Sequence, residues 1–258
     1  MKNYIRIALL YIVIQGIGMA MMYYGFGIVY GEPGMANVVL WVEIILALLV
    51  VFYVRRTASW RAVGFGKINW LQTLWIVPNL LLVLLPTLGI LAALVTGNLG
   101  GEALLGVVTA GALTLLVGFA EEAMFRGIVL RGALQDHGVY VAMLISALTF
   151  TLLHMVNVLG GLPPGDLPNH LFSQLLYGAF MAPLALLIRN LVPLILLHFM
   201  WDFSVLAGAL APTGAQSDLL VLLPGLSSPI QIVLTVILWV VVLLLRKKDN
   251  LQLEKSES

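Results

Sequence analysis

The sequence contains no cysteine, and only 10% of its 258 residues are charged. The absence of cysteine excludes disulfides, thiol nucleophiles and thiolate metal ligands. A soluble domain carries about 25% charged residues, so the scarcity of charge argues against an ordinary soluble protein. Any chemistry must rest on carboxylates, histidines and hydroxyl groups. The formal net charge of +1 gives no indication of a nucleic-acid partner, and we expect none.

Long apolar runs take the place of the missing charge. Hydrophobic residues make up 61% of the chain, in runs close to the roughly 20 residues that cross a bilayer. Because lipid offers the backbone no hydrogen bonds, each run is expected to be a helix. We therefore predict an all-α polytopic membrane protein with about eight transmembrane helices, at residues 7–30, 36–54, 70–95, 103–131, 139–158, 170–188, 191–210 and 219–245.

These spans are expected to form a single membrane domain, residues 1–258, because no internal repeat or long linker divides them. The first apolar run begins like a signal peptide but is longer than a typical signal core, so we interpret it as a transmembrane helix. Pro78, Pro86 and Pro183 are expected to kink their helices. The segment 224–229, which begins and ends with proline, is expected to kink or break the last one.

The basic residues fall on one side of this arrangement. All 13 Lys and Arg lie at the two termini, in alternate connections or, for Arg126 and Arg131, at the end of the fourth span, while the opposite loops carry Glu32, Glu102, Asp166 and Asp218. The positive-inside rule therefore places both termini in the cytoplasm. The basic and aromatic segment 55–70 is expected to lie on the cytoplasmic leaflet of the bilayer.

One apolar run contains the sequence GFAEEAMFRG, with three charged residues. Glu122 and Arg126 are four residues apart and can pair on one face of a helix. Glu121 points about 100° away from Glu122 and has no local partner. One carboxylate is thus committed to structure and the other is free to react.

Two more polar pairs interrupt later runs. Phe150 and His154 share a face in the sequence FTLLH, and His198 and Asp202 share a face in HFMWD. Ionisable residues inside a membrane are rare and normally face the interior of the bundle. About 15 Å of helix separates Glu121 from the basic side, which agrees with a site in the cytoplasmic half.

Two histidines and several carboxylates from separate helices suit the activation of water. A partly desolvated glutamate can act as general base, and a histidine beside it can share the proton. The same set, Glu121, His154, His198 and Asp202, could instead hold a zinc ion and leave one position for water. Either arrangement leads to hydrolysis of an amide-like bond inside the bilayer.

Together the three motifs resemble those of the CPBP intramembrane proteases, which include the CAAX prenyl endopeptidases and the bacterial Abi, or bacteriocin-processing, relatives. That family carries E-E-x-x-x-R, F-x-x-x-H and H-x-x-x-N or H-x-x-x-D on separate spans, here EEAMFR, FTLLH and HFMWD. The resemblance covers residues 103–210 as a catalytic core, with 1–102 and 211–258 as flanking helices. It implies that spans four to seven surround a cavity open to the cytoplasm, in the cell (inner) membrane of a prokaryote.

The resemblance also implies roles for the motif residues. Glu121 would activate water with His154, Glu122 and Arg126 would hold the site together with Phe150 in support, and His198 with Asp202 would stabilise the oxyanion. CAAX proteases usually have asparagine where this chain has Asp202, and an ionised aspartate can only accept hydrogen bonds. Asp202 must therefore be protonated, orient His198 or ligate a metal, so a glutamate-type and a metal-dependent enzyme both remain open.

The function that follows is an intramembrane endopeptidase acting on a membrane-associated protein or peptide, of CAAX type or leader-peptide type. The alternative is a non-catalytic scaffold or bacteriocin-immunity protein that keeps the family's site. A proton-coupled transporter is disfavoured because the chain has no inverted repeat. The remaining polar residues are interpreted without a catalytic role: Gln15, Glu43, Asn79 and Gln174 as packing groups, and His137 and His170 as solvated.

Overall fold

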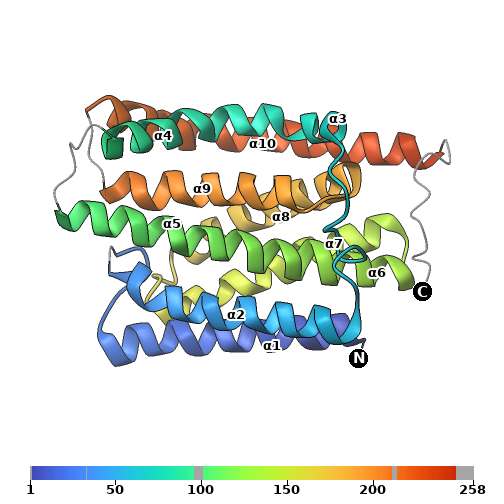
Figure 1. The fold of residues 1–258 in the computed structure, drawn as a ribbon, viewed down its shortest axis with the longest axis horizontal. Coiled ribbons are helices and arrows are strands. Elements are labelled where there is room, and N and C mark those ends of the chain that lie inside the picture. The colour runs from blue at the N-terminus through green and yellow to red at the C-terminus, as the bar shows by residue number, and fades with distance from the viewer. Residues whose placement is uncertain (1, 33, 96–100, 211–213, 248–258) are drawn as a thin grey trace.

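A computed structural model describes residues 2–32, 34–95, 101–210 and 214–247 (Figure 1). Within these ranges the chain forms helices and their connections, and no strand. The predicted all-α class is confirmed. The predicted turns at residues 96–100 and 211–213 lie outside the described residues.

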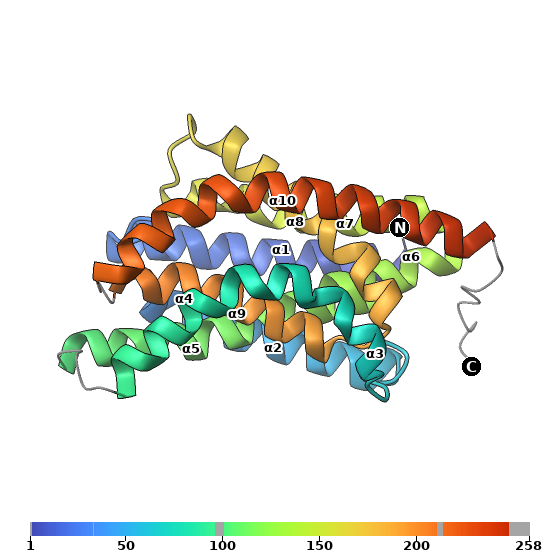
Figure 2. The same ribbon diagram turned by 90° about the horizontal axis from the view of Figure 1, so that it is seen from above.

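The long helices lie side by side along one direction, as Figures 1 and 2 show from two sides. In chain order the elements are α1 (Asn3–Ala20), η1 (Met21–Gly25), α2 (Met35–Thr57), α3 (Trp70–Thr73), η2 (Leu74–Ile76), α4 (Val77–Val95), α5 (Gly101–Glu121), η3 (Glu122–Val129), α6 (Leu130–Asp136), α7 (Val139–Met155), η4 (Val156–Gly160), α8 (Leu167–Ile188), α9 (Val192–Leu210) and α10 (Gly214–Lys247).

Five helical segments among the described residues are long and apolar enough to cross a membrane: Asn3–Gly25, Met35–Thr57, Gly101–Asp136, Val139–Gly160 and Leu167–Ile188. A sixth results if the bent pair Trp70–Leu81 and Pro86–Ala92 is one span. Two shorter apolar helices cover Val192–Gly208 and Pro229–Leu245. The chain is thus an integral membrane protein by its helices, and the predicted count of eight is not confirmed.

Helix α2 illustrates how these helices meet lipid. It buries Leu46 and Val50 against the bundle, yet the face with Trp41, Ile45 and Leu48 is also apolar and is exposed in the isolated chain. A helix that is hydrophobic all round belongs in a membrane or in the core of a large protein. The exposed apolar face therefore meets the hydrocarbon of the bilayer.

Prolines shape two helices differently. The axis bends by 76° between Trp70–Leu81 and Pro86–Ala92, in agreement with the predicted kink at Pro86. Helix α10, by contrast, runs without interruption through residues 224–229, so the predicted break in the last span is wrong. A proline costs a helix one backbone hydrogen bond, and that loss need not end the helix.

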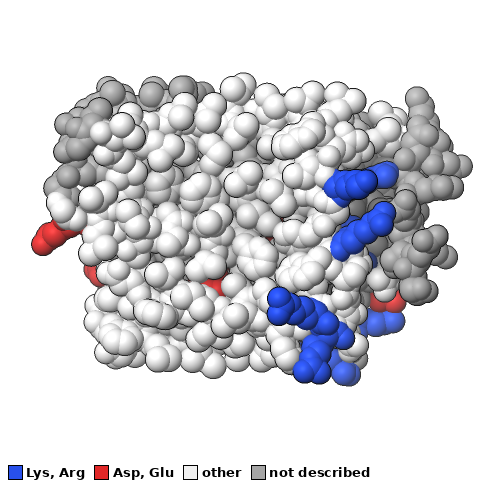
Figure 3. Space-filling model, viewed as in Figure 1, with Lys and Arg blue, Asp and Glu red and all other residues white. Residues whose placement is uncertain are grey.

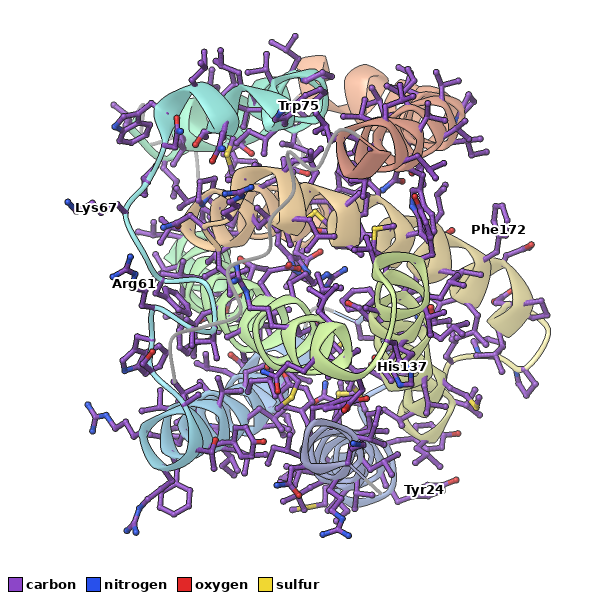
Figure 4. All side chains as sticks on the ribbon, turned by 90° about the vertical axis from the view of Figure 1, so that its right-hand side faces the viewer. Tyr24, Arg61, Lys67, Trp75, His137 and Phe172 are labelled. Atoms are coloured by element: carbon purple, nitrogen blue, oxygen red, sulfur yellow. The ribbon has the colours of Figure 1, made fainter. Side chains whose placement is uncertain are left out.

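Charge is divided between the two ends of the bundle. Lys and Arg gather at one end in Figure 3, which we call the basic end. Glu32, Glu102 and Asp166 are exposed before or at the start of α2, α5 and α8, the ends of these helices away from the basic end. Residues 58–69 cross the basic end as an irregular loop, and Figure 4 looks onto that end and shows Arg61 and Lys67 pointing away from the bundle.

Close backbone packing between α7 and α8 depends on Gly178. A Cβ atom there would lie 3.1 Å from Ala147 Cα and 3.2 Å from its carbonyl oxygen. We expect Gly178→Leu to lower the free energy of unfolding by about 1–3 kcal/mol, because the backbones would have to separate. SDS titration of the purified protein would measure the change.

Gly165 is the matched control, since a Cβ there meets no atom within 4 Å. Gly165→Leu should leave the unfolding midpoint unchanged. Equal effects of the two substitutions would contradict the packing argument.

Candidate functional site

A cavity of about 750 Å³ lies between α1, α2, α4, α5, α7, α8, α9 and α10. This volume falls within the roughly 300–1,000 Å³ of typical ligand-binding cavities. Its lining includes apolar side chains and an unusual number of polar ones for a membrane interior: Gln15, Tyr30, Glu43, Thr114, Glu121, His154, Asn157, Ser173, Gln174, Tyr177, His198, Asp202, Ser204 and Gln231. All four predicted catalytic residues are among them.

A buried network connects the first and third motifs. Arg126 Nη1 donates to Glu122 Oε1 at 3.0 Å, and both side chains are fully buried. The same Glu122 oxygen accepts from Nδ1 of His198 on α9, at 2.8 Å. The predicted pairing of Glu122 with Arg126 is present, and it also fixes one ring nitrogen of His198.

Aromatic rings bring the second motif into this network. The Arg126 guanidinium carbon lies 4.3 Å from the centre of the Phe150 ring, within the range of a cation–π interaction. The Tyr177 ring lies 5.1 Å from His198 and 5.7 Å from Phe150. Phe150 therefore shields the buried guanidinium, which explains an aromatic residue in this motif.

The local helix geometry at the first motif is a π-helix. Element η3 begins at Glu122 and ends at Val129 within one long segment from Gly101 to Asp136. π-helical turns are rare and are often found at functional sites. Ser146 Oγ donates to the carbonyl oxygen of Phe125 at 2.9 Å, which ties this turn to α7.

The second nitrogen of His198 faces two carboxylates. His198 Nε2 lies 3.3 Å from Asp202 Oδ2 and 3.9 Å from Glu121 Oε2. Glu121 is buried, and among the described residues its Oε2 atom has no hydrogen-bond partner. The Asp202 side chain is 34% exposed. Glu43 Oε2 and Glu122 Oε2 also lack a partner among the described residues, but of the two adjacent glutamates only Glu121 lines the cavity.

His154 lines the same cavity and is half-buried. Its Nδ1 atom lies 3.0 Å from the carbonyl oxygen of Phe150, which can only accept a hydrogen bond. Nδ1 therefore carries the proton, and the lone pair of neutral His154 is on Nε2. Within the described residues no hydrogen bond joins His154 directly to Glu121.

Three polar residues interpreted as packing groups also line the cavity: Gln15, Glu43 and Gln174. Glu43 on α2 is only 1% exposed and lines the same cavity as Glu121. A glutamate within an apolar run could have indicated that Glu43 faces the interior of the bundle. Because Glu43 belongs to no motif, the sequence did not connect it with the site. Asn79 is buried and does not line the cavity.

His170 is less solvated than predicted. Its ring is half-buried, its Nε2 lies 3.0 Å from Nδ2 of Asn157, and its ring centre is 5.8 Å from that of His154. His137 is exposed, as predicted. The loop before α8 turns His170 toward η4, and sequence position alone did not indicate that turn.

The donor arrangement does not fit the zinc ion that the sequence left open. Nδ1 of His198 is held by Glu122, and its Nε2 lies 3.3 Å from Asp202 Oδ2. In the described part of the chain, no three His, Asp or Glu side chains are grouped as metal ligands. We therefore derive no step through a metal.

Comparison with protein families identifies the segment that carries the three motifs. Residues 102–204 match the family described as type II CAAX prenyl endopeptidase Rce1-like. This match confirms the resemblance drawn from the motifs, and the family is one of proteases. Comparisons with curated proteins and with solved structures gave no match.

The buried network yields a stability prediction. Arg126→Met leaves the Glu122 carboxylate without its cation and should cost about 3–5 kcal/mol of unfolding free energy. The double variant Glu122→Gln, Arg126→Met removes both charges and should cost less than the sum of the two single changes. SDS-unfolding midpoints of all three variants would measure the coupling, and strict additivity would contradict it.

Proposed function

We propose that the protein is a glutamate-type intramembrane endopeptidase, and that it hydrolyses a peptide bond of a membrane-associated protein or peptide inside its cavity. The observation that carries this proposal is the contrast between the two adjacent glutamates. One oxygen of Glu122 is held by Arg126 and His198, and Glu122 does not line the cavity, whereas Glu121 lines it and has an oxygen without a hydrogen bond.

In the proposed reaction Glu121 accepts a proton from a water molecule as the water oxygen attacks the scissile carbonyl carbon. The Nε2 lone pair of His154 accepts the second water proton in a hydrogen bond and so orients that water. Since no direct bond links the two side chains, the water or the substrate must lie between them. Glu121 then returns its proton to the leaving amine as the C–N bond breaks, giving an amine and a carboxylic acid.

His198 and Asp202 act on the carbonyl oxygen in this proposal. Nδ1 of His198 is held by Glu122, so Nε2 keeps a fixed direction toward the cavity. A proton on Nε2 can be donated to the developing oxyanion, and preorganised donors of this kind stabilise the transition state. The 3.3 Å approach of Asp202 supports the role of orienting His198, one of the three roles that the sequence left open.

The family match supports a membrane-associated substrate, since residues 102–204 match a prenyl endopeptidase family. A CAAX-type C-terminus and a leader peptide both remain within the proposal. A non-catalytic scaffold would not need the Glu121 oxygen that has no hydrogen bond. The first experiment below separates the two functions.

Glu121→Gln should lower cleavage at least about 100-fold, because an amide cannot act as the general base. The measurement compares new protein termini in host membranes that contain matched amounts of wild type or variant. Glu102→Gln is the control, since Glu102 is an exposed glutamate on the same helix that does not line the cavity.

Wild-type and Glu102→Gln membranes should share cleavage products that are missing with Glu121→Gln. Identical termini in all three, with equal amounts of folded protein, would overturn the proposed function in favour of the scaffold.

Metal removal should leave the reaction unchanged, because the described donors do not form a metal site. Treatment of purified protein with EDTA or 1,10-phenanthroline is expected to change the cleavage rate less than about twofold. Loss of activity that zinc restores would show that the family's metal-dependent alternative applies.

A further inference from the structure

The cavity occupies only one part of the bundle's length. Counted from the basic end, between about 9 and 24 Å of each lining helix passes before its first lining residue is reached. These first residues are Gln15 on α1, Glu43 on α2, Val83 on α4, Glu121 on α5, Leu153 on α7, Tyr177 on α8, His198 on α9 and Gln231 on α10. The described lining therefore lies on the far side of the catalytic groups, away from the Lys and Arg residues.

The basic end itself is closed by the loop of residues 58–69. Trp60 and Phe65 pack on each other and on Phe119, which lies two residues before Glu121. The loop is also fastened to the bundle, since Leu191 N donates to the Gly64 carbonyl at 2.9 Å. None of its residues lines the cavity. Its aromatic side chains thus separate the catalytic groups from the basic end.

The opposite end of the cavity is open. Of the described residues that line it, the exposed ones are Gly31 in the α1–α2 connection, Phe172 and Ser173 at the start of α8, and Val205 on α9. Phe172 projects from the bundle in Figure 4, and the first turns of α8 stand apart from the other helices in Figure 2. The cavity therefore reaches solvent or the membrane interface beside these residues, which we call the mouth.

Charge gives this geometry a direction. Lys and Arg flanking transmembrane helices stay in the cytoplasm, so the basic end is the cytoplasmic end. The mouth then opens on the other side of the membrane. The predicted cytoplasmic termini and the predicted cytoplasm-facing cavity cannot both be correct for this structure.

We propose that the cavity receives its substrate from the extracytoplasmic side, so that the cleaved bond belongs to a polypeptide segment emerging from the outer leaflet. This inference rests on the proposed function and adds the side of the membrane. It favours a leader-peptide or membrane-anchored segment over a cytoplasmic C-terminal motif.

The lining supports a substrate of this chemistry. Apolar walls near the mouth are formed by Met35, Val39, Leu176, Val205 and Leu206, beside the polar Tyr30, Ser173 and Gln174, and the polar catalytic groups lie farther in. An apolar stretch that leaves the bilayer can contact these walls. Its peptide bond then reaches the water-activating groups without crossing the membrane.

Because the chain has no cysteine, single thiols can report the side directly. Ser173→Cys places a thiol at the mouth, and Ser59→Cys places one on the exposed loop at the basic end. Glu102→Cys marks the end opposite the basic residues, away from the mouth. A membrane-impermeant maleimide is added to spheroplasts, before and after permeabilisation.

We expect labelling at Ser173→Cys and Glu102→Cys in sealed spheroplasts, and at least tenfold less at Ser59→Cys until permeabilisation. The reverse pattern, or equal labelling of all three, overturns the extracytoplasmic opening. This readout needs no activity, so it stands apart from failure of the Glu121→Gln test.

A second measurement tests whether substrate uses the mouth. A bulky maleimide on Ser173→Cys should reduce cleavage at least tenfold, and the same group on Glu102→Cys should not. Full cleavage by protein that is completely labelled at Ser173→Cys would overturn the assignment of the mouth.

Discussion

The site depends on the buried positive charge of Arg126, which would be energetically costly inside a membrane without its partners. The guanidinium of Arg126 is fully buried, and it is tolerated because Glu122 neutralises it and the Phe150 ring covers it. An unpaired charge at this depth would be very costly, so these partners must remain together. Glu122 extends the constraint to His198, and one ion pair thereby fixes three helices around Glu121.

Much of this arrangement could be predicted from the sequence, because polar residues in an apolar background carry a strong signal. Four-residue spacing predicted the Glu122–Arg126 pair, and three motifs predicted which helices meet. The apolar runs predicted the all-helical class. Such patterns succeed since each rests on a local rule of helix geometry or of solvation.

Other features had no local signal. Glu43 reaches the cavity only because α2 packs beside α5, and His170 turns inward only because of the loop before α8. The direction of the opening depends on how the loop of residues 58–69 folds back over the bundle. Counting residues along the helix gave the distance of Glu121 from the basic end. It did not indicate at which end of the bundle the cavity opens.

The π-helix at Glu122–Val129 limits how the sequence of this segment can change during evolution. In such a helix each turn holds more residues than an α-turn, so its length sets the rotation of everything that follows. Removing one residue would convert a π-turn to an α-turn or change the rotation of α6 relative to α5. The spacing of this segment is therefore constrained more tightly than its side chains, and insertions or deletions within it should be rarer than substitutions.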